Sequence, residues 1–238
     1  KADQDRLFGR HPNDGPSLMG VAGLMRLLGK RFGDLSFSDL KIPFACSAVD
    51  YKSGREIVLH DGCVLDAVIA SSAMPGIFPP RTIGDLELVD GGMLDPVPVE
   101  IVRWLEPRLP IVAVVLSPPQ EQWARVPSFQ VPRNRSIPSL IADQFSHLRL
   151  ARALQIFIDS TDISLRMLTE LRLKSDAPDL VIRPDVCQWP LLAKIDPGEL
   201  VQTGSDAAAA QMPRIKKLGS WTYGLFGRRR IPFVPRLS

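Results

Sequence analysis

The sequence of 238 residues is poor in the residues that carry redox or metal chemistry. Its three cysteines, Cys46, Cys63 and Cys187, form no CxxC pair and lie far apart. An odd number of widely spaced cysteines is typical of reduced thiols in an intracellular protein, and it argues against a disulfide framework. The three histidines show no metal-ligand spacing to these cysteines. The sequence therefore predicts no metal site and no cofactor.

Long apolar runs and a leader sequence are also missing. No run reaches the roughly 18 apolar residues that a membrane-spanning helix needs. The first residues, "KADQDRLFGRHPNDG", are polar and charged, unlike a signal peptide. The chain begins with Lys instead of Met, which predicts a processed or truncated N-terminus. We expect a cytoplasmic protein, with peripheral attachment to a membrane as an alternative.

The composition is that of a globular protein with a basic end. Hydrophobic residues make up 45% and charged residues 23%, which favours one folded domain, expected at residues 1–218. The net charge is +3, and no acid follows Asp206. A basic tail is expected at residues 219–238; it is either a solvated end or a contact for an anionic surface.

Aromatic residues in this tail favour a membrane over a nucleic acid as its partner. Trp221, Tyr223 and Phe226 precede the run Arg228, Arg229 and Arg230. Aromatic and basic side chains together are typical of a membrane interface. The sequence shows no nucleic-acid recognition motif and no stacking array, so we expect no nucleic-acid partner.

Strand and helix patterns alternate along the chain, which predicts an α/β domain with a largely parallel central sheet and one hairpin turn at residues 53–54. Strands are expected at 42–51, 55–62, 86–90, 111–117 and 179–184, and helices at 17–33, 63–74, 97–105, 137–174 and 196–218.

Several details of these elements are also predicted. Asp14 or Ser17 is expected to cap the first helix, and Asp196 to cap the last, with Pro197 in its first turn. The apolar, β-branched run at 111–117 predicts a strand covered on both faces. A break in the long helix is expected near 160–162.

Asp90, in "ELVDGGMLDPVPV", is the most suggestive acid in the chain. It ends an apolar run and precedes Gly91 and Gly92, whose missing side chains allow close approach of a ligand or another backbone segment. An acid at the end of a buried strand is placed where α/β proteins hold their sites. A turn residue, a metal ligand and a catalytic base are the alternatives, and the local Asp-Gly pattern by itself favours the turn.

No nucleophile is evident from the sequence. A G-x-S-x-G elbow occurs nowhere in the chain. The nearest approach, "GPSLMG", has Met19 in place of the second glycine and no strand before it, so Ser17 is interpreted as a helix cap. Ser71 and Ser72, at the end of a short helix, are the remaining candidates.

The order of three stretches resembles the patatin-like phospholipase family, especially its bacterial branch related to neuropathy target esterase. "LKIPFACSAVDYKSGREIVLHDG" is followed by "AVIASSAMPGIFPP" and then by "LVDGGMLDPVPV". The family's A-S-x-A-x-P-x-x-F-x-P pattern is matched at Ala70, Ser71, Ala73, Pro75, Phe78 and Pro80. Its D-G-[GA] motif is matched at Asp90, Gly91 and Gly92. The later "DLVIRPDV" and "GELVQTGSDAA" also look like this branch, so the resemblance runs from about Asp34 to Leu218.

The resemblance implies a three-layer patatin-like fold and hydrolysis of lipid acyl esters by a Ser–Asp dyad. Asp90 would be the proton acceptor for the serine, with no histidine between them, and a glycine-rich loop would supply oxyanion donors. Residues near Met74, Ile77, Phe78 and Met93 would lie beside the acyl chain. The substrate would be a phospholipid, a lysophospholipid or another fatty-acyl ester.

The chain departs from the family pattern in one respect. Both the glycine-rich loop and the G-x-S-x-G belong upstream of Lys1, so the N-terminal strand–helix unit is expected to be missing. Whether the chain is an enzyme therefore stays open. The alternative is a non-catalytic fragment or pseudoenzyme that binds a membrane or a partner.

Overall fold

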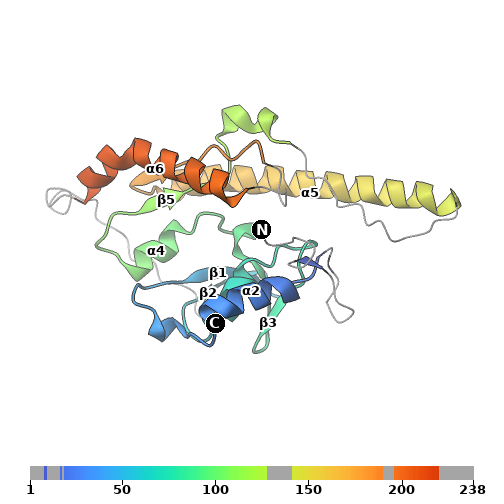
Figure 1. The fold of residues 1–238 in the computed structure, drawn as a ribbon, viewed down its shortest axis with the longest axis horizontal. Helices are drawn as coiled ribbons and strands as arrows, with labels where there is room; N and C mark the ends of the chain where they lie inside the picture. Colours follow the sequence, from blue (N-terminus) through green and yellow to red (C-terminus); the bar gives the residue numbers. More distant parts are fainter. Residues whose placement is uncertain (1–7, 10–16, 18, 128–140, 190–195, 220–238) are drawn as a thin grey trace. The chain divides into compact units, whose positions relative to one another are not determined.

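A computed structural model describes residues 8–9, 17, 19–127, 141–189 and 196–219 of the chain. The expected tail at 219–238 lies outside the described residues except for Gly219, and so do Arg228, Arg229 and Arg230. The described residues form two units, one up to Ile111 and one from Val112 onward. Elements carry the labels of Figure 1.

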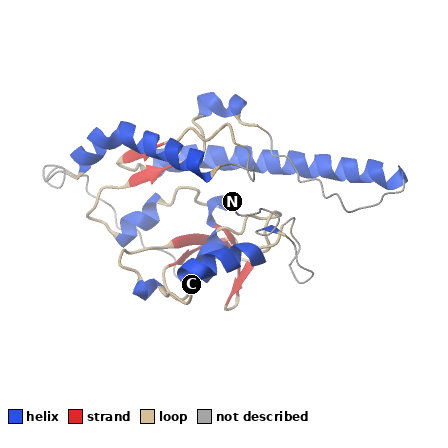
Figure 2. Ribbon diagram, viewed as in Figure 1, coloured by secondary structure: helices blue, strands red, loops and turns tan. Residues whose placement is uncertain are grey.

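The first unit is built on a four-stranded sheet, whose strands are red in Figure 2. The strand order is β2-β1-β4-β3. The strands are β1 (Cys46–Asp50), β2 (Arg55–Leu59), β3 (Arg81–Ile83) and β4 (Leu86–Asp90). The helices are α2 (Ala22–Phe32), α3 (Val64–Ser71) and α4 (Val99–Leu105), with 3₁₀ turns η1 (Phe37–Asp39) and η2 (Gly91–Met93).

The mixed α/β class is confirmed, but a largely parallel sheet is not, because every pairing in this four-stranded sheet is antiparallel. Short connections explain the direction of the β1–β2 and β3–β4 pairings. The expected β1–β2 hairpin is present, with Asp50 opposite Arg55 and Gly54 at φ +69° in its turn. Strand β3 was not predicted, and it forms a second hairpin with β4 around Gly84 and Asp85. A two-residue connection can only join antiparallel strands.

Helix α3 covers one face of this sheet. Val64 and Ala67 of α3 pack with Cys46 of β1, and Ala70 packs with Ala48 and Leu88. Side chains on one strand alternate between faces, and directly paired residues share a face. Asp90 is paired with Ala48, so the register places Asp90 on the face that α3 covers.

The second unit contains a parallel pair of strands and two long helices. Its elements are β5 (Val112–Val114), η3 (Gln120–Arg125), α5 (Ile141–Asp176), β6 (Leu180–Ile182) and α6 (Pro197–Leu218). Strand β5 pairs with β6 in parallel. The prediction that both faces of β5 are covered is wrong: Ala113 and Val115 are buried, whereas Val114 is 60% exposed.

The expected break near 160–162 is also wrong, because α5 runs without interruption (Figure 1). The hydroxyls of Ser160 and Thr161 donate to the carbonyl oxygens of Ile156 and Phe157, one turn earlier. This bonding satisfies the hydroxyls inside the helix, so they do not compete with it.

Helix ends follow the predictions in one case and depart from them in another. Asp196 caps α6 by accepting a hydrogen bond from the Gly198 amide, and Pro197 stands in the first turn. Helix α2 begins at Ala22, later than predicted, with no side-chain cap. The Ser17 hydroxyl donates to the Met19 carbonyl instead, and Asp14 lies outside the described residues.

Within the ranges that the structure describes, no helix is both long and apolar enough to cross a membrane.

Candidate active site

Asp90 is held at the point where β4 passes into the turn η2. It is the N-cap of η2, and its Oδ1 accepts a 2.8 Å hydrogen bond from the Gly92 amide. Its own amide donates to the carbonyl oxygen of Ala73, in the segment after α3. The turn interpretation of Asp90 is therefore confirmed. A metal ligand is not supported among the described residues, where no group of three or more His, Cys, Asp or Glu converges.

Gly91 is needed because β1 passes directly against it. A Cβ at Gly91 would lie no farther than 2.5 Å from the Ser47 hydroxyl oxygen, carbonyl oxygen and carbonyl carbon. Two of these atoms belong to the backbone, which cannot rotate away. The close approach expected from the two glycines is thus made at Gly91 by another backbone segment. It fixes the turn after Asp90 against the neighbouring strand.

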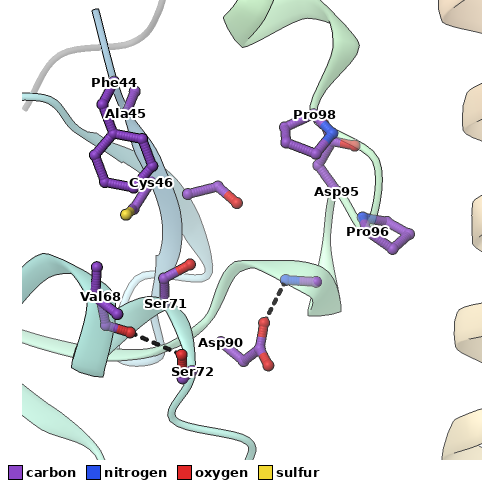
Figure 3. Close-up of a pocket in the computed structure, with 12 residues that line it drawn as sticks. Phe44, Ala45, Cys46, Val68, Ser71, Ser72, Asp90, Asp95, Pro96 and Pro98 are labelled. Atoms are coloured by element: carbon purple, nitrogen blue, oxygen red, sulfur yellow. Dashed lines mark hydrogen bonds between the residues drawn. The ribbon is translucent and has the colours of Figure 1, made fainter. Parts of the chain in front are cut away.

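Asp90 lines a pocket of about 390 Å³ in the first unit. Its walls come from the segment entering β1, the last turn of α3, the end of β4 and the loop before α4. The lining residues are Phe44, Ala45, Cys46, Ser47, Val68, Ser71, Ser72, Asp90, Gly92, Asp95, Pro96 and Pro98. In Figure 3, Ser71 at the end of α3 and its C-cap Ser72 lie on one side, and Pro96 and Pro98 lie on the other. A pocket of apolar walls with a few polar groups is a typical small-molecule site.

Burial sets the electrostatics of the pocket. Burial raises the pKa of the Asp90 carboxyl, and the hydrogen bond from the Gly92 amide opposes part of this effect by favouring the charged form. Among the described residues, the carboxylate receives no other hydrogen bond, so Oδ2 is left unbonded. Burial also raises the pKa of the Cys46 thiol to about 11, which keeps this pocket residue protonated at neutral pH.

The two candidate serines of α3 both reach the pocket. The Ser72 hydroxyl donates a 2.8 Å hydrogen bond to the Val68 carbonyl, as the dashed line in Figure 3 shows. The Asp90 carboxylate accepts its hydrogen bond from the Gly92 amide, and in Figure 3 it points away from Ser72. The hydroxyl of Ser72 is thus engaged with its own helix and is not hydrogen-bonded to Asp90. Ser17 does not line this pocket.

Sequence reasoning identified Asp90 but missed most of the pocket. Asp95 is buried in the pocket wall and accepts a hydrogen bond from the Val97 amide, and the helix expected at 97–105 begins only at Val99. The apolar residues expected beside an acyl chain do not line this pocket: they are Met74, Ile77, Phe78 and Met93. Ile77 is instead part of the core. The "PF" stretch beside the pocket was an available signal, because Pro43 and Phe44 are exposed in a loop and binding residues are disproportionately found on loops.

The histidines and the other cysteines lie elsewhere. His60 packs edge-on against Trp104 with ring centroids 5.1 Å apart, and it does not line the pocket. His11 and the side chain of His147 lie outside the described residues. All three cysteines are free thiols.

The first unit thus has the features of an α/β protein with a buried carboxylate at a strand end, facing a pocket with apolar walls. The model of the family described as patatin-like phospholipase matches residues 2–103, a range that includes Asp90. The chain is also similar to curated proteins of mycobacteria. The uncharacterized NTE family protein Rv1063c of Mycobacterium tuberculosis is 34% identical over 67 residues, 28% of this chain and 19% of the relative. The Mycobacterium bovis protein Mb1092c matches with the same identity and the same shares of both chains.

A second uncharacterized NTE family protein of Mycobacterium tuberculosis, Rv2565, is 35% identical over 77 residues, 32% of this chain and 13% of the relative. Together, these matches support a patatin-like domain in the chain. The matched stretches span less than a fifth of the length of these relatives. The family match ends at residue 103, so the resemblance of the later stretches stays a prediction.

Proposed function

We propose that this chain carries the base-bearing part of a lipid acyl ester hydrolase, with Asp90 as the proton acceptor of a Ser–Asp dyad. The observation that carries the proposal is the position of Asp90. It lies within the patatin-like match, at the end of β4, with its carboxylate in a pocket with apolar walls. Phe44, Val68 and Pro98 give these walls a chemistry suited to an acyl chain.

The carboxylate of Asp90 suits general base chemistry. Its Oδ1 is held by the Gly92 amide, which fixes the orientation of the group, and its Oδ2 accepts no hydrogen bond from the part of the chain that the structure describes, so it can receive a proton. A raised pKa brings the basicity of the carboxylate closer to the working pH, where a general base is most effective. Asp90 would remove the proton from a serine hydroxyl as its oxygen attacks the ester carbonyl. The same proton would then pass to the departing alcohol, leaving an acyl-serine that water hydrolyses.

The serine and the oxyanion donors are the missing parts of this mechanism. The sequence contains no G-x-S-x-G, and Ser72 uses its hydroxyl within α3. Because the resemblance implies a serine within G-x-S-x-G, the proposal places the nucleophile and the glycine-rich loop in sequence outside these 238 residues, as part of one patatin-like domain that includes residues 1–218. Phospholipids, lysophospholipids and neutral fatty-acyl esters all fit the proposal. Contact of Arg228, Arg229 and Arg230 with an anionic membrane remains a separate proposal.

The alternative function is a non-catalytic module that retains the fold and binds a membrane or a partner. The absence of G-x-S-x-G from the sequence favours it. Removing the nucleophile of a serine hydrolase abolishes nearly all of its covalent catalysis. The alternative predicts that the chain binds lipid vesicles but hydrolyses no ester.

The coding sequence upstream of Lys1 separates the two functions. The hydrolase proposal expects an open frame that encodes a glycine-rich loop followed by G-x-S-x-G. An upstream frame without either motif would favour the non-catalytic module. If the 238-residue chain hydrolyses an ester by itself and Asp90→Ala abolishes this activity, the nucleophile lies within the chain, and its assignment to upstream sequence is wrong.

A further inference from the structure

An exposed apolar segment leads directly into the wall of the Asp90 pocket. Residues 41–44, here called the lip, connect η1 to β1 and belong to no helix or strand. All four lip residues are exposed, and Ile42 is 78% exposed. Burial of an isoleucine side chain this exposed would be favourable, because removing apolar surface from water lowers the free energy. Surface apolar residues gathered beside a site are a mark of an interaction surface.

The lip packs against the core of the first unit. The ring of Phe44 stacks on that of Phe37, with centroids 5.8 Å apart and planes inclined by 18°. Phe37 is buried in the cluster that includes Cys46 and Val64. Phe44 itself is 41% exposed and also lines the pocket. The lip is therefore held in place by a buried partner while its outer side chains face water.

The charge of the lip suits the surface of a phospholipid membrane. Lys41 is the only charged residue between Leu40 and Ala45. A cation beside exposed isoleucine, proline and phenylalanine can meet lipid phosphates while the apolar side chains enter the acyl boundary. A phospholipid surface suits both the cation and the apolar side chains of the lip. It is also where a water-insoluble ester resides.

We propose that the lip inserts into the phospholipid surface and docks the mouth of the Asp90 pocket there, so that an ester passes from the membrane along Phe44. This inference rests on the proposed hydrolase function, because it specifies how that site would reach a membrane-held substrate. Docking and hydrolysis are separate properties. Vesicle binding tests the first without requiring the second.

The test measures binding of the full chain to phosphatidylcholine vesicles and to vesicles with equal amounts of phosphatidylcholine and phosphatidylglycerol, by co-sedimentation. Ile42→Ser removes an exposed side chain and should leave the fold intact. We expect it to weaken binding to both vesicle types by about five- to tenfold. Ile42→Trp should bind at least as tightly as the unmodified chain, because tryptophan favours the interface. Lys41→Gln should weaken binding only to the anionic vesicles.

Val201→Ser is the matched control, because Val201 on α6 is also an aliphatic side chain that is 69% exposed. It should bind vesicles like the unmodified chain. Equal losses in Ile42→Ser and Val201→Ser, no effect of Ile42→Ser, or no vesicle binding at all would each overturn the proposal. An Ile42→Ser variant that loses self-association but keeps vesicle binding would assign the lip to a second copy of the chain and also overturn it.

Asp90→Asn keeps these outcomes distinct from those of the proposed function. It should bind vesicles normally, since Asp90 lies outside the lip. The lip variants could confirm membrane docking while Asp90→Asn still hydrolyses the ester in the longer protein. That result would refute only the assignment of Asp90 as the base. Loss of hydrolysis in Asp90→Asn, with binding unaffected by Ile42→Ser, would refute the lip alone.

Discussion

The amide of Gly92 donates a 2.8 Å hydrogen bond to Oδ1 of Asp90, so the residue that makes the turn after β4 also contributes an acid to the pocket. A turn residue and a proton acceptor are therefore compatible roles for one side chain. The hydrogen bond fixes one carboxylate oxygen and leaves the other unbonded among the described residues. The structure shows Asp90 in the turn, whereas its role as proton acceptor is a proposal.

Asp90 should reduce the stability of the fold at neutral pH. Burial raises the pKa of this carboxyl above its ordinary value of 3.8, so the folded state binds the proton more tightly than the unfolded chain. The contribution of Asp90 to stability therefore falls as the pH rises from 3.8 through the raised pKa, and it stays low above it. Asp90→Asn, which keeps an acceptor for Gly92, should increase the free energy of unfolding at neutral pH in urea titrations.

The matched control for this stability measurement is Asp85→Asn, because Asp85 is exposed in the β3–β4 turn. It should change the free energy of unfolding little at any pH. An Asp90→Asn variant that is less stable than the unmodified chain at neutral pH would contradict the claim that the buried, charged carboxylate of Asp90 destabilises the fold. The increase in the free energy of unfolding caused by Asp90→Asn should shrink as the pH is lowered through the raised pKa of Asp90.

Gly91→Ala should disrupt the turn that holds Asp90. The added methyl group would collide with the backbone of Ser47, so β1 or the turn must move. Overpacking of this kind costs about 1–3 kcal/mol. Thermal unfolding should show a lower midpoint for Gly91→Ala. Gly204→Ala, in α6 with open space around the added atom, should be neutral or stabilising by up to about 1 kcal/mol. Equal effects of both substitutions would contradict the packing argument.

The three thiols should react with an alkylating reagent in a definite order. Cys63 is exposed and should react first. The hydrogen bond to the Asp185 carboxylate is the main cause that raises the pKa of the Cys187 thiol, which should slow its reaction. Cys46 is buried with a pKa of about 11, so it should react last. Mass spectrometry of the folded chain after timed iodoacetamide treatment measures this order. Early labelling of Cys46 would contradict the structure of the pocket wall.

Ser72→Ala should have little effect on either stability or ester hydrolysis. The Ser72 hydroxyl is exposed and bonds to the Val68 carbonyl within its own helix, an arrangement that adds little to helix stability. Its removal should change the free energy of unfolding by no more than about 0.5 kcal/mol. Loss of hydrolysis in Ser72→Ala, with the fold intact by circular dichroism, would instead identify Ser72 as a nucleophile.

Local features of the fold could be predicted because their causes are local. The β1–β2 hairpin follows from two neighbouring strand patterns joined by the turn at 53–54, and the start of α6 follows from Asp196 and Pro197. Strand direction is not a local property, and the expected parallel sheet failed where short hairpins joined neighbouring strands. The predicted break in α5 failed for another reason. The hydroxyls of Ser160 and Thr161 found partners inside the helix.

The site was predictable at Asp90 and less so around it. A strand-end acid followed by two glycines, placed after "ASSAMPGIFPP", singled out the carboxylate from the sequence. The walls of the Asp90 pocket could not be predicted from the sequence in the same way. Phe44, Val68 and Pro98 come together only through the pairing of β1 with β4 and the packing of α3. Asp95 illustrates the difference. In the sequence it is only an acid that precedes a predicted helix, while its burial in the pocket depends on tertiary structure.

The most direct test of the central claim is ester hydrolysis by the chain extended with its own upstream coding sequence. Initial rates on a fatty-acyl ester should be measured for the unmodified protein, Asp90→Asn and Asp85→Asn, with folding of each confirmed by circular dichroism. The proposal predicts that Asp90→Asn lowers kcat by about 10²–10⁴-fold, as expected for loss of a general base, while Asp85→Asn keeps the full rate. Hydrolysis that continues undiminished in a folded Asp90→Asn variant would contradict the assignment of Asp90 as the proton acceptor.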